Sequence, residues 1–202
     1  VNRRTAEVRH AFTMTLEDRL RPLASPKQIK FEAARLLARG LGVERVGYAE
    51  DTGDGQSARI VNCYAEGLAT LRGTHAYETF GDDVAQKFRA GQMMIRANID
   101  RDSTLTEEDR RAYRSIGVAA TINVSLVKNG RPIALLFVHS ARPRDWSAEE
   151  LALVEAVAHR TWDAVERARA ERLARHAARE LRARSERLLL FIEHAQIGRA
   201  HV

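Results

Sequence analysis

Residues 124–150, VSLVKNGRPIALLFVHSARPRDWSAEE, contain two apolar runs followed by the start of a helix. The runs are separated by Asn129–Gly130, a dipeptide with a strong preference for two-residue hairpin turns. Further on, Ser147 is a good helix N-cap with Glu150 three residues later, and Trp146 can pack onto the first helical turn. The stretch therefore predicts a β-hairpin that leads directly into a helix with a well-defined start.

The helix that begins at Ala148 is predicted to continue to about Arg187. At 1.5 Å per residue it would be about 60 Å long, far above the usual helix length of ~11–12 residues, so one small domain cannot cover it. Its apolar stripe comprises Leu151, Val154, Ala158, Thr161, Trp162 and Val165 and then, more weakly, Leu173, Ala177, Leu181, Leu188 and Ile192. Steps of four in the second part imply a locally unwound coiled coil. Pairing with the same helix of a second chain would bury this stripe, so the sequence predicts a parallel homodimer.

The residues before this helix alternate between helical and strand patterns. A helix is predicted over 5–23, and a second one runs from Ser25–Pro26 to Gly40 or Gly42. Strand patterns follow at 43–50, 58–66, 92–98, 119–127 and 132–140, with short helices at 82–91 and 106–117. This order predicts an α/β (α+β) domain.

Composition and charge narrow the class of protein. The chain has 202 residues, a net charge of +6 and one cysteine, Cys63, which excludes an internal disulfide and any CxxC motif. It lacks a membrane-length apolar run and a secretory signal, so we expect a soluble, cytoplasmic protein, and a start at Val1 suggests part of a longer one. Between Arg160 and Arg187 nine arginines accompany five acidic residues. Such interleaving is typical of solvated coiled-coil flanks, and we expect neither nucleic-acid nor membrane binding.

Three stretches resemble GAF domains, namely GVERVGYAE at 42–50, AYRSIGVAATINVSLVKNGRPIALLFVHS at 112–140 and RDWSAEELALVEAVAHRTWDAVERARAE at 144–171. The resemblance covers about residues 15–170 and is to the GAF modules of bacterial multidomain sensor histidine kinases. It implies a GAF-like central antiparallel sheet with helices on one face, flanked by an N-terminal helix and a long C-terminal signalling helix or coiled coil. SERLLLFIEHAQIG, near the end, is similar to the entry of a PAS domain. The implied division is an N-terminal dimerisation or linker helix at 1–24, a sensor core at 25–146, a signalling helix at 147–187, and the start of a PAS-like module or a disordered tail at 188–202.

The sequence does not predict catalysis by this part of the protein. Methionine-sulfoxide reductases with this fold need several cysteines, because one thiol cannot both attack the sulfoxide and resolve the product. A kinase phosphoacceptor His is followed by Glu or Asp, whereas His10 is followed by Ala, His159 by Arg and His194 by Ala. Glycine-rich ATP-binding motifs are also missing from the sequence. We expect no catalytic residue and no metal ligand, with any kinase activity belonging to the longer protein.

Ligand binding remains open. Bilin-binding GAF domains commonly use a Cys-His pair, but Cys63 is followed by Tyr64 within a strand pattern and is expected to be a buried thiol. Haem ligation through His75 or His139 is an alternative. Strand alternation places Thr121, Asn123 and Ser125 on the face opposite the apolar side chains of the same strand. A small polar ligand site or an ordinary solvated face fits this pattern, and the candidate ligand-binding residues are Arg96, Asn98, Tyr113, Thr121, Asn123 and Ser125.

The resemblance and the long helix together predict a regulatory sensor and dimerisation module of a two-component signalling protein. It would relay the state of a ligand or a neighbouring domain through parallel C-terminal helices to downstream PAS and kinase domains. No resident cofactor is expected, although an unidentified small molecule is compatible with the site. The alternatives are a photosensor with bilin or haem, a redox sensor, a purely structural dimerising spacer and a GAF-containing transcription regulator. The predicted dimer interface is Phe12, Leu16, Leu20, Val154, Thr161, Val165, Leu173, Ala177 and Leu181.

Overall fold

The computed structural model describes the backbone of residues 3–199 and the side chains of residues 7 and 9–189. A six-stranded antiparallel sheet forms the centre, with strand order β3-β2-β1-β6-β5-β4. The helices are α1 (Arg3–Leu20), α2 (Pro26–Leu41), α3 (Asp82–Arg89), α4 (Glu107–Ser115) and α5 (Ala148–Arg199), with short 3₁₀ turns η1 (Tyr77–Phe80) and η2 (Ile99–Arg101). The strands are β1 (Arg45–Asp51), β2 (Ser57–Ala65), β3 (Gly73–Ala76), β4 (Met94–Arg96), β5 (Ala120–Lys128) and β6 (Arg131–Ser140).

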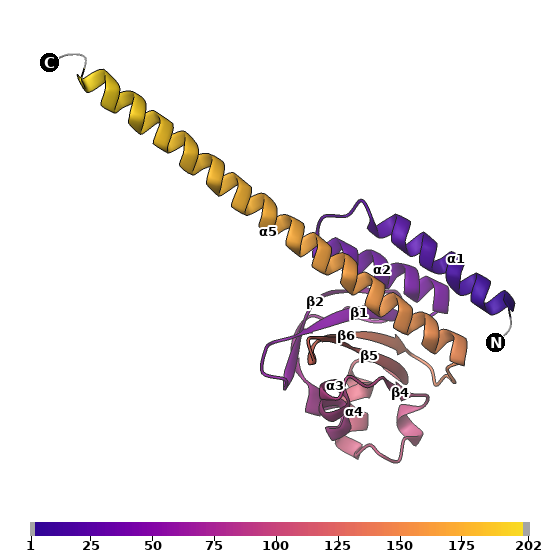
Figure 1. The fold of residues 1–202 in the computed structure, drawn as a ribbon. Coiled ribbons are helices and arrows are strands. Elements are labelled where there is room, and N and C mark those ends of the chain that lie inside the picture. The colour runs from indigo at the N-terminus through magenta and orange to yellow at the C-terminus, as the bar shows by residue number, and fades with distance from the viewer. Residues whose placement is uncertain (1–2, 200–202) are drawn as a thin grey trace.

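The sheet is covered differently on its two faces (Figure 1). The three long helices α1, α2 and α5 lie over one face, as the resemblance implies, and the short helices α3 and α4 lie over the other. Strand alternation explains the division, because Ile122, Val124 and Leu126 of β5 all belong to the core under the long helices. A second, smaller core on the opposite face contains Cys63 of β2 and Phe137 of β6. The space beneath α3 and α4 is where a site can form.

The β5–β6 hairpin confirms the prediction made for residues 124–150. Asn129 and Gly130 both have positive φ, 51° and 74°, as a primed hairpin turn requires. The capping box at the start of α5 also forms, since the Ser147 N–H donates to Glu150 Oε2 at 2.9 Å and the Glu150 N–H donates to Ser147 Oγ at 3.2 Å. The start of α5 is therefore fixed at Ala148, eight residues after the end of the central strand β6.

The glycine in the middle of β1 permits close packing under α3. A Cβ added at Gly47 would lie 2.5 Å from Cys63 Cβ and 2.5 Å from Phe137 Cζ. Those distances are well inside van der Waals contact, so any side chain at this position would force β1, β2 and β6 apart. Gly47 is thus required by packing rather than by backbone conformation.

Helix α5 belongs to the domain core in its first part and projects from the domain in its second (Figure 1). The side chains from Val154 to Ala168 that face the sheet are buried, whereas Leu173 and Leu181 are 67% and 63% exposed. The helix has 52 residues and would be about 78 Å long, so it continues past the predicted end near Arg187. Residues 188–199 are helical, and 200–202 lie outside the described residues.

The predicted dimer interface divides into two groups. Leu16, Leu20, Val154, Thr161 and Val165 are at most 2% exposed and belong to the buried interior of the chain itself. Phe12 is half-buried and packs on the same core. For the five fully buried residues the prediction of direct contact with a second chain is wrong, because α1, α2, α5 and the sheet already cover them. For Phe12, which keeps part of its surface exposed, it stays a prediction. Leu173, Ala177 and Leu181 are exposed and remain available to a partner.

Candidate functional site

A small cavity lies between the sheet and the segment η1–α4. Its volume is about 70 Å³. Most of its wall is apolar, and its polar side chains come from five different elements, β3, η1, α4, β5 and β6. The lining residues are Ala49, Ala58, Ile60, Leu71, His75, Ala76, Tyr77, Phe80, Val84, Tyr113, Ile116, Asn123, Leu135, Phe137 and His139.

Tyr113 and Asn123 are the two predicted ligand residues that reach this cavity. Tyr113 on α4 is 2% exposed, and its hydroxyl has no hydrogen-bond partner among the described residues. Burial raises the pKa of Tyr113 to about 12, so the hydroxyl keeps its proton. Asn123 on β5 is half-buried and sits opposite Phe137 in the sheet register. The cavity therefore presents a buried hydroxyl and an amide from two separate elements.

His139 supplies a third polar group, and its orientation is fixed from two sides. Its ring stacks on Phe137 with centroids 4.8 Å apart, and its Nδ1 accepts a hydrogen bond of 3.1 Å from Arg45 Nε. Burial, followed by the positive charge of Arg45, holds the pKa of His139 well below its ordinary value. The ring is neutral, and because Nδ1 is an acceptor the proton resides on Nε2.

Arg45 is fully buried at the start of β1 and ties the polar edge of the cavity together. Its Nη1 donates to the Ala69 carbonyl at 2.7 Å, and its Nη2 donates to the Ile116 carbonyl at 2.9 Å. Burial lowers the pKa of Arg45 to about 10, which still leaves it charged at neutral pH. No carboxylate of the described residues pairs with it.

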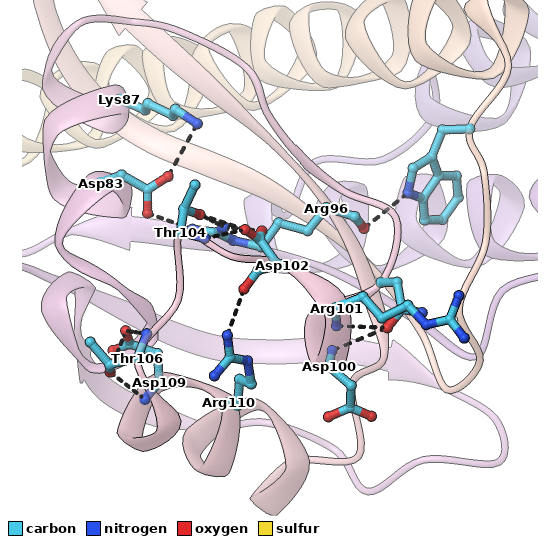
Figure 2. Close-up of polar contacts among 12 residues, drawn as sticks. Asp83, Lys87, Arg96, Asp100, Arg101, Asp102, Thr104, Thr106, Asp109 and Arg110 are labelled. Atoms are coloured by element: carbon cyan, nitrogen blue, oxygen red, sulfur yellow. Dashed lines mark hydrogen bonds and ion pairs between the residues drawn. The ribbon is translucent and has the colours of Figure 1, made fainter.

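Arg96 does not line the cavity but closes an ion-pair network beside it (Figure 2). Its side chain is 2% exposed and pairs with Asp83 of α3 at 2.5 Å and with Asp102 after η2. Thr104 Oγ1 accepts a further hydrogen bond from Arg96 Nη1 at 3.0 Å, and Arg110 of α4 donates to the Asp102 carbonyl at 2.8 Å. Arg96 thus fastens α3 and the loop leading to α4 onto β4.

The other predicted ligand residues have structural contacts instead. Asn98 caps η2 by accepting from the backbone N–H groups of Asp100 and Arg101 at 3.1 and 3.3 Å. Ser125 donates to the Gln92 carbonyl at 3.2 Å. Thr121 is fully buried opposite His139 in the β5–β6 register, and its hydroxyl has no partner among the described residues. Of the six candidates, the structure places Tyr113 and Asn123 at the cavity, and Arg96, Asn98, Thr121 and Ser125 away from its lining.

The sequence analysis did not assign a ligand role to Arg45 or Tyr77, and it considered His139 only as a haem ligand. The position of Arg45 inside the mainly apolar strand VERVGYAE was the one sequence feature that could have indicated a buried arginine. Tyr77 lines the cavity, and its hydroxyl donates to Asp51 at 3.2 Å. Strand alternation could have placed His139 on the same face as Phe137, but not above a cavity.

Cys63 is a buried thiol, which confirms the expectation for this residue. Its Sγ accepts from the Leu71 N–H at 3.2 Å, and it is absent from the cavity lining. The residues that the structure describes contain no cluster of three or more potential metal-binding side chains. Within the same residues, no helix is apolar enough over the required length to span a membrane. A cavity of about 70 Å³ is also small beside the 300–1,000 Å³ of typical cofactor sites.

The buried His139 makes stability depend on pH. An unfolded histidine has a pKa near 6.5, whereas the folded value is well below that, so under acid conditions the unfolded chain binds one more proton. We expect the free energy of unfolding to fall as pH drops below about 6.5, with this group contributing up to ~1.4 kcal/mol per pH unit. His139→Asn keeps an acceptor near Arg45. It should weaken the dependence of the free energy of unfolding on pH, which urea unfolding at several pH values measures as the slope of that free energy against pH. An unchanged slope would contradict the buried, neutral state of His139.

The six-stranded antiparallel sheet, with long helices on one face and a small cavity on the other, defines an α+β domain. Residues 26–165 match the family described as GAF domain. The chain belongs to the GAF domain family. No curated protein matches the sequence.

Solved structures with this fold come from several kinds of protein. A phycoerythrobilin-bound GAF domain from a cyanobacterial phytochrome is 13% identical, with a TM-score of 0.70 over 81% of this chain and 97% of that chain. The free methionine-R-sulfoxide reductase from Neisseria meningitidis is 13% identical, with a TM-score of 0.66 over 85% and 95%. A domain described as belonging to a two-component sensor histidine kinase from Sinorhizobium meliloti is 19% identical, with a TM-score of 0.58 over 75% and 97%. At these identities the likeness concerns the fold.

Proposed function

We propose that this chain is a non-catalytic sensor and dimerisation module of a two-component signalling protein. It relays the state of its cavity, or of a neighbouring domain, through a parallel pair of α5 helices to a downstream kinase. The observation that carries this proposal is the construction of α5, which is part of the domain core up to Ala168 and exposed beyond it. A displacement of the core is therefore transmitted along one continuous helix.

The exposed part of α5 supports pairing with a second copy of the same helix. Leu173, Leu181, Leu188 and Leu189 are between 62% and 67% exposed, in contrast with the buried residues of the first part. A long helix gains most of its stability from packing its apolar face. In a parallel, in-register pair the leucines of one α5 would pack against the same leucines of the other. Ion pairs such as Arg175–Glu171 lie beside the stripe and fit the solvated flanks of a coiled coil.

A second group of contacts supports coupling between the cavity and α5. Glu50, at the end of β1, accepts a hydrogen bond of 2.6 Å from Arg169 of α5 and another from Lys30 of α2. Burial alone would raise the pKa of Glu50, but Lys30 and Arg169 hold it below its ordinary value. The next residue, Asp51, accepts from the hydroxyl of Tyr77, which lines the cavity. Asp51 and Glu50 are adjacent in β1, and they connect Tyr77 to Arg169, which lies where α5 leaves the domain. A movement of Tyr77 would therefore be passed to α5 through these two residues.

Spin labels at the exposed positions Ala170 and Ser185, introduced one at a time, test the arrangement of the helices. In a parallel pair both sites give label distances of roughly 20 Å or less, because paired helix axes lie about 8–10 Å apart. In an antiparallel pair the axial separations of the two label pairs add up to at least about 45 Å, because the sites are 15 residues apart at 1.5 Å per residue, so at least one pair is about 22 Å or more apart along the axis alone. Two short distances are expected, and one long distance would overturn the parallel relay.

The Glu50 contacts can be tested in the same samples. Glu50→Gln should shift or broaden the distance distribution at Ala170, because it weakens the attachment of Arg169 at the exit of α5. Glu155→Gln is the control because it makes the same chemical change at an exposed residue of α5 that has no described ion pair. Equal distributions in the two variants would remove Glu50 from the coupling.

A further inference from the structure

The polar edge of the cavity contains hydrogen-bond donors that lack acceptors. The hydroxyl of Tyr113 lines the cavity close to the Arg96 guanidinium, and its proton has no acceptor among the described residues. The structure also describes no acceptor for the Nε2 proton of His139. A buried polar group without a partner is costly, and such groups are uncommon in native proteins. Their accumulation at one cavity indicates that an acceptor-bearing molecule completes the site.

The electrostatic balance around the cavity identifies the charge of that molecule. Two arginines are buried in the sheet, and they differ in whether carboxylates pair with them. Arg96 is matched by the carboxylates of Asp83 and Asp102. Arg45 contacts two carbonyls and the neutral ring of His139, and within residues 7 and 9–189 no carboxylate compensates its charge. Buried charges are normally paired, so the positive charge behind His139 favours a negative group in front of it.

The remaining wall identifies the rest of the molecule. Apart from the polar edge, the lining is aliphatic and aromatic, with Ile60, Val84 and Leu135 among its members. An inorganic anion would leave this apolar surface uncovered, whereas a short hydrocarbon would fill it. The volume of about 70 Å³ admits a body of only a few heavy atoms.

We propose that the cavity binds a small carboxylate with a short apolar body, its carboxyl group accepting hydrogen bonds from His139 Nε2 and the Tyr113 hydroxyl. Asn123 lies beside them on β5 and can donate through its amide. Arg45 acts through His139, because its Nε–H fixes the tautomer that leaves a donor on Nε2. The inference names the ligand class of the proposed sensor and rests on that sensory function.

Propionate and the neutral amide propionamide are matched probes, since they have the same body and number of heavy atoms. In the dimeric protein labelled with ¹⁵N-histidine, propionate should shift the His139 Nε2 signal saturably with a dissociation constant of roughly millimolar size, as expected for so few atoms. Propionamide should bind at least about tenfold more weakly. Equal affinity for the two probes, or no saturable shift with propionate, would overturn the inference.

Two variants separate binding from folding. Tyr113→Phe removes a hydroxyl that has no partner among the described residues, so the thermal stability without ligand should be equal or higher while propionate affinity falls several-fold. A purely structural tyrosine would give the opposite stability change. His139→Asn should abolish the preference for propionate over propionamide, and retention of full propionate affinity by both variants would contradict the assignment.

The outcomes also separate this inference from the relay. Propionate binding that leaves the Ala170 and Ser185 label distances unchanged would overturn propionate control of α5 but support the carboxylate site. Label distances that change in Glu50→Gln, together with no saturable propionate binding, would support the relay and overturn the carboxylate site.

Discussion

Replacing Leu173 and Leu181 together with Asp is expected to convert the proposed dimer into a folded monomer. Each dimer loses four leucines from the paired α5 helices, and burying one leucine contributes about 1.5–3 kcal/mol. The dissociation constant should therefore rise at least about a thousandfold, since every 1.4 kcal/mol corresponds to a factor of ten. Sedimentation equilibrium at micromolar protein measures this change directly.

The control for this variant must change the charge equally without touching the apolar stripe. Arg179→Gln with Arg182→Gln lowers the net charge by two per chain, as the two Leu→Asp changes do, and both arginines are exposed on α5 with no described ion pair. This control should remain dimeric, while circular dichroism should show native helix content in both proteins because the domain core ends at Ala168. A Leu173→Asp/Leu181→Asp protein that stays fully dimeric would place the dimer contact elsewhere.

The sequence predicted α5 well. It could not show which residues of the apolar stripe pack on the chain's own sheet and which remain exposed for a second chain. A helix that packs on its own sheet and a helix that packs on a second chain both repeat apolar residues every three or four positions. Val165 and Leu173 therefore look equivalent in the sequence, although one is fully buried and the other is 67% exposed. Leu16 and Leu20 were misassigned for the same reason.

The hairpin and the helix caps were predictable because their signals are local. Asn129–Gly130 and Ser147 with Glu150 each depend on residues within a few positions of one another. The site was predicted only in part because its members meet through tertiary packing. Arg45 and His139 are 94 residues apart, and nothing in either neighbourhood specifies their contact. Asn98 looked like a ligand residue because a polar side chain that caps a turn and one that faces a cavity are alike in sequence.

Arg96→Gln is expected to produce the second large effect, a loss of stability. The arginine is buried, and the substitution leaves the carboxylates of Asp83 and Asp102 without their cation. Removing one partner of a buried ion pair typically costs 3–5 kcal/mol, and because both carboxylates are partly exposed we expect about 2–3 kcal/mol. Chemical unfolding of the two proteins in urea measures this difference.

The exposed Arg114 provides the matched control for Arg96, because it also pairs with two carboxylates, Asp100 and Glu107. Half of its side chain is exposed and solvent screens its charge, so Arg114→Gln should reduce the free energy of unfolding much less than Arg96→Gln does. If the two variants were equally stable, burial would not be the source of the strength of the Arg96 network.

The location of the damage distinguishes a local role of Arg96 from a general one. Arg96 connects β4 to α3 through Asp83 and to the loop before α4 through Asp102, and these elements cover the cavity. In Arg96→Gln, amide hydrogen exchange should accelerate first in α3 and α4 while α2 and the buried part of α5 stay protected. Because Tyr113 lies on α4, the same variant should also bind propionate more weakly. Uniform acceleration of exchange across the sheet would instead show that Arg96 stabilises the whole domain. It would then have no special role in holding α3 and α4 over the cavity.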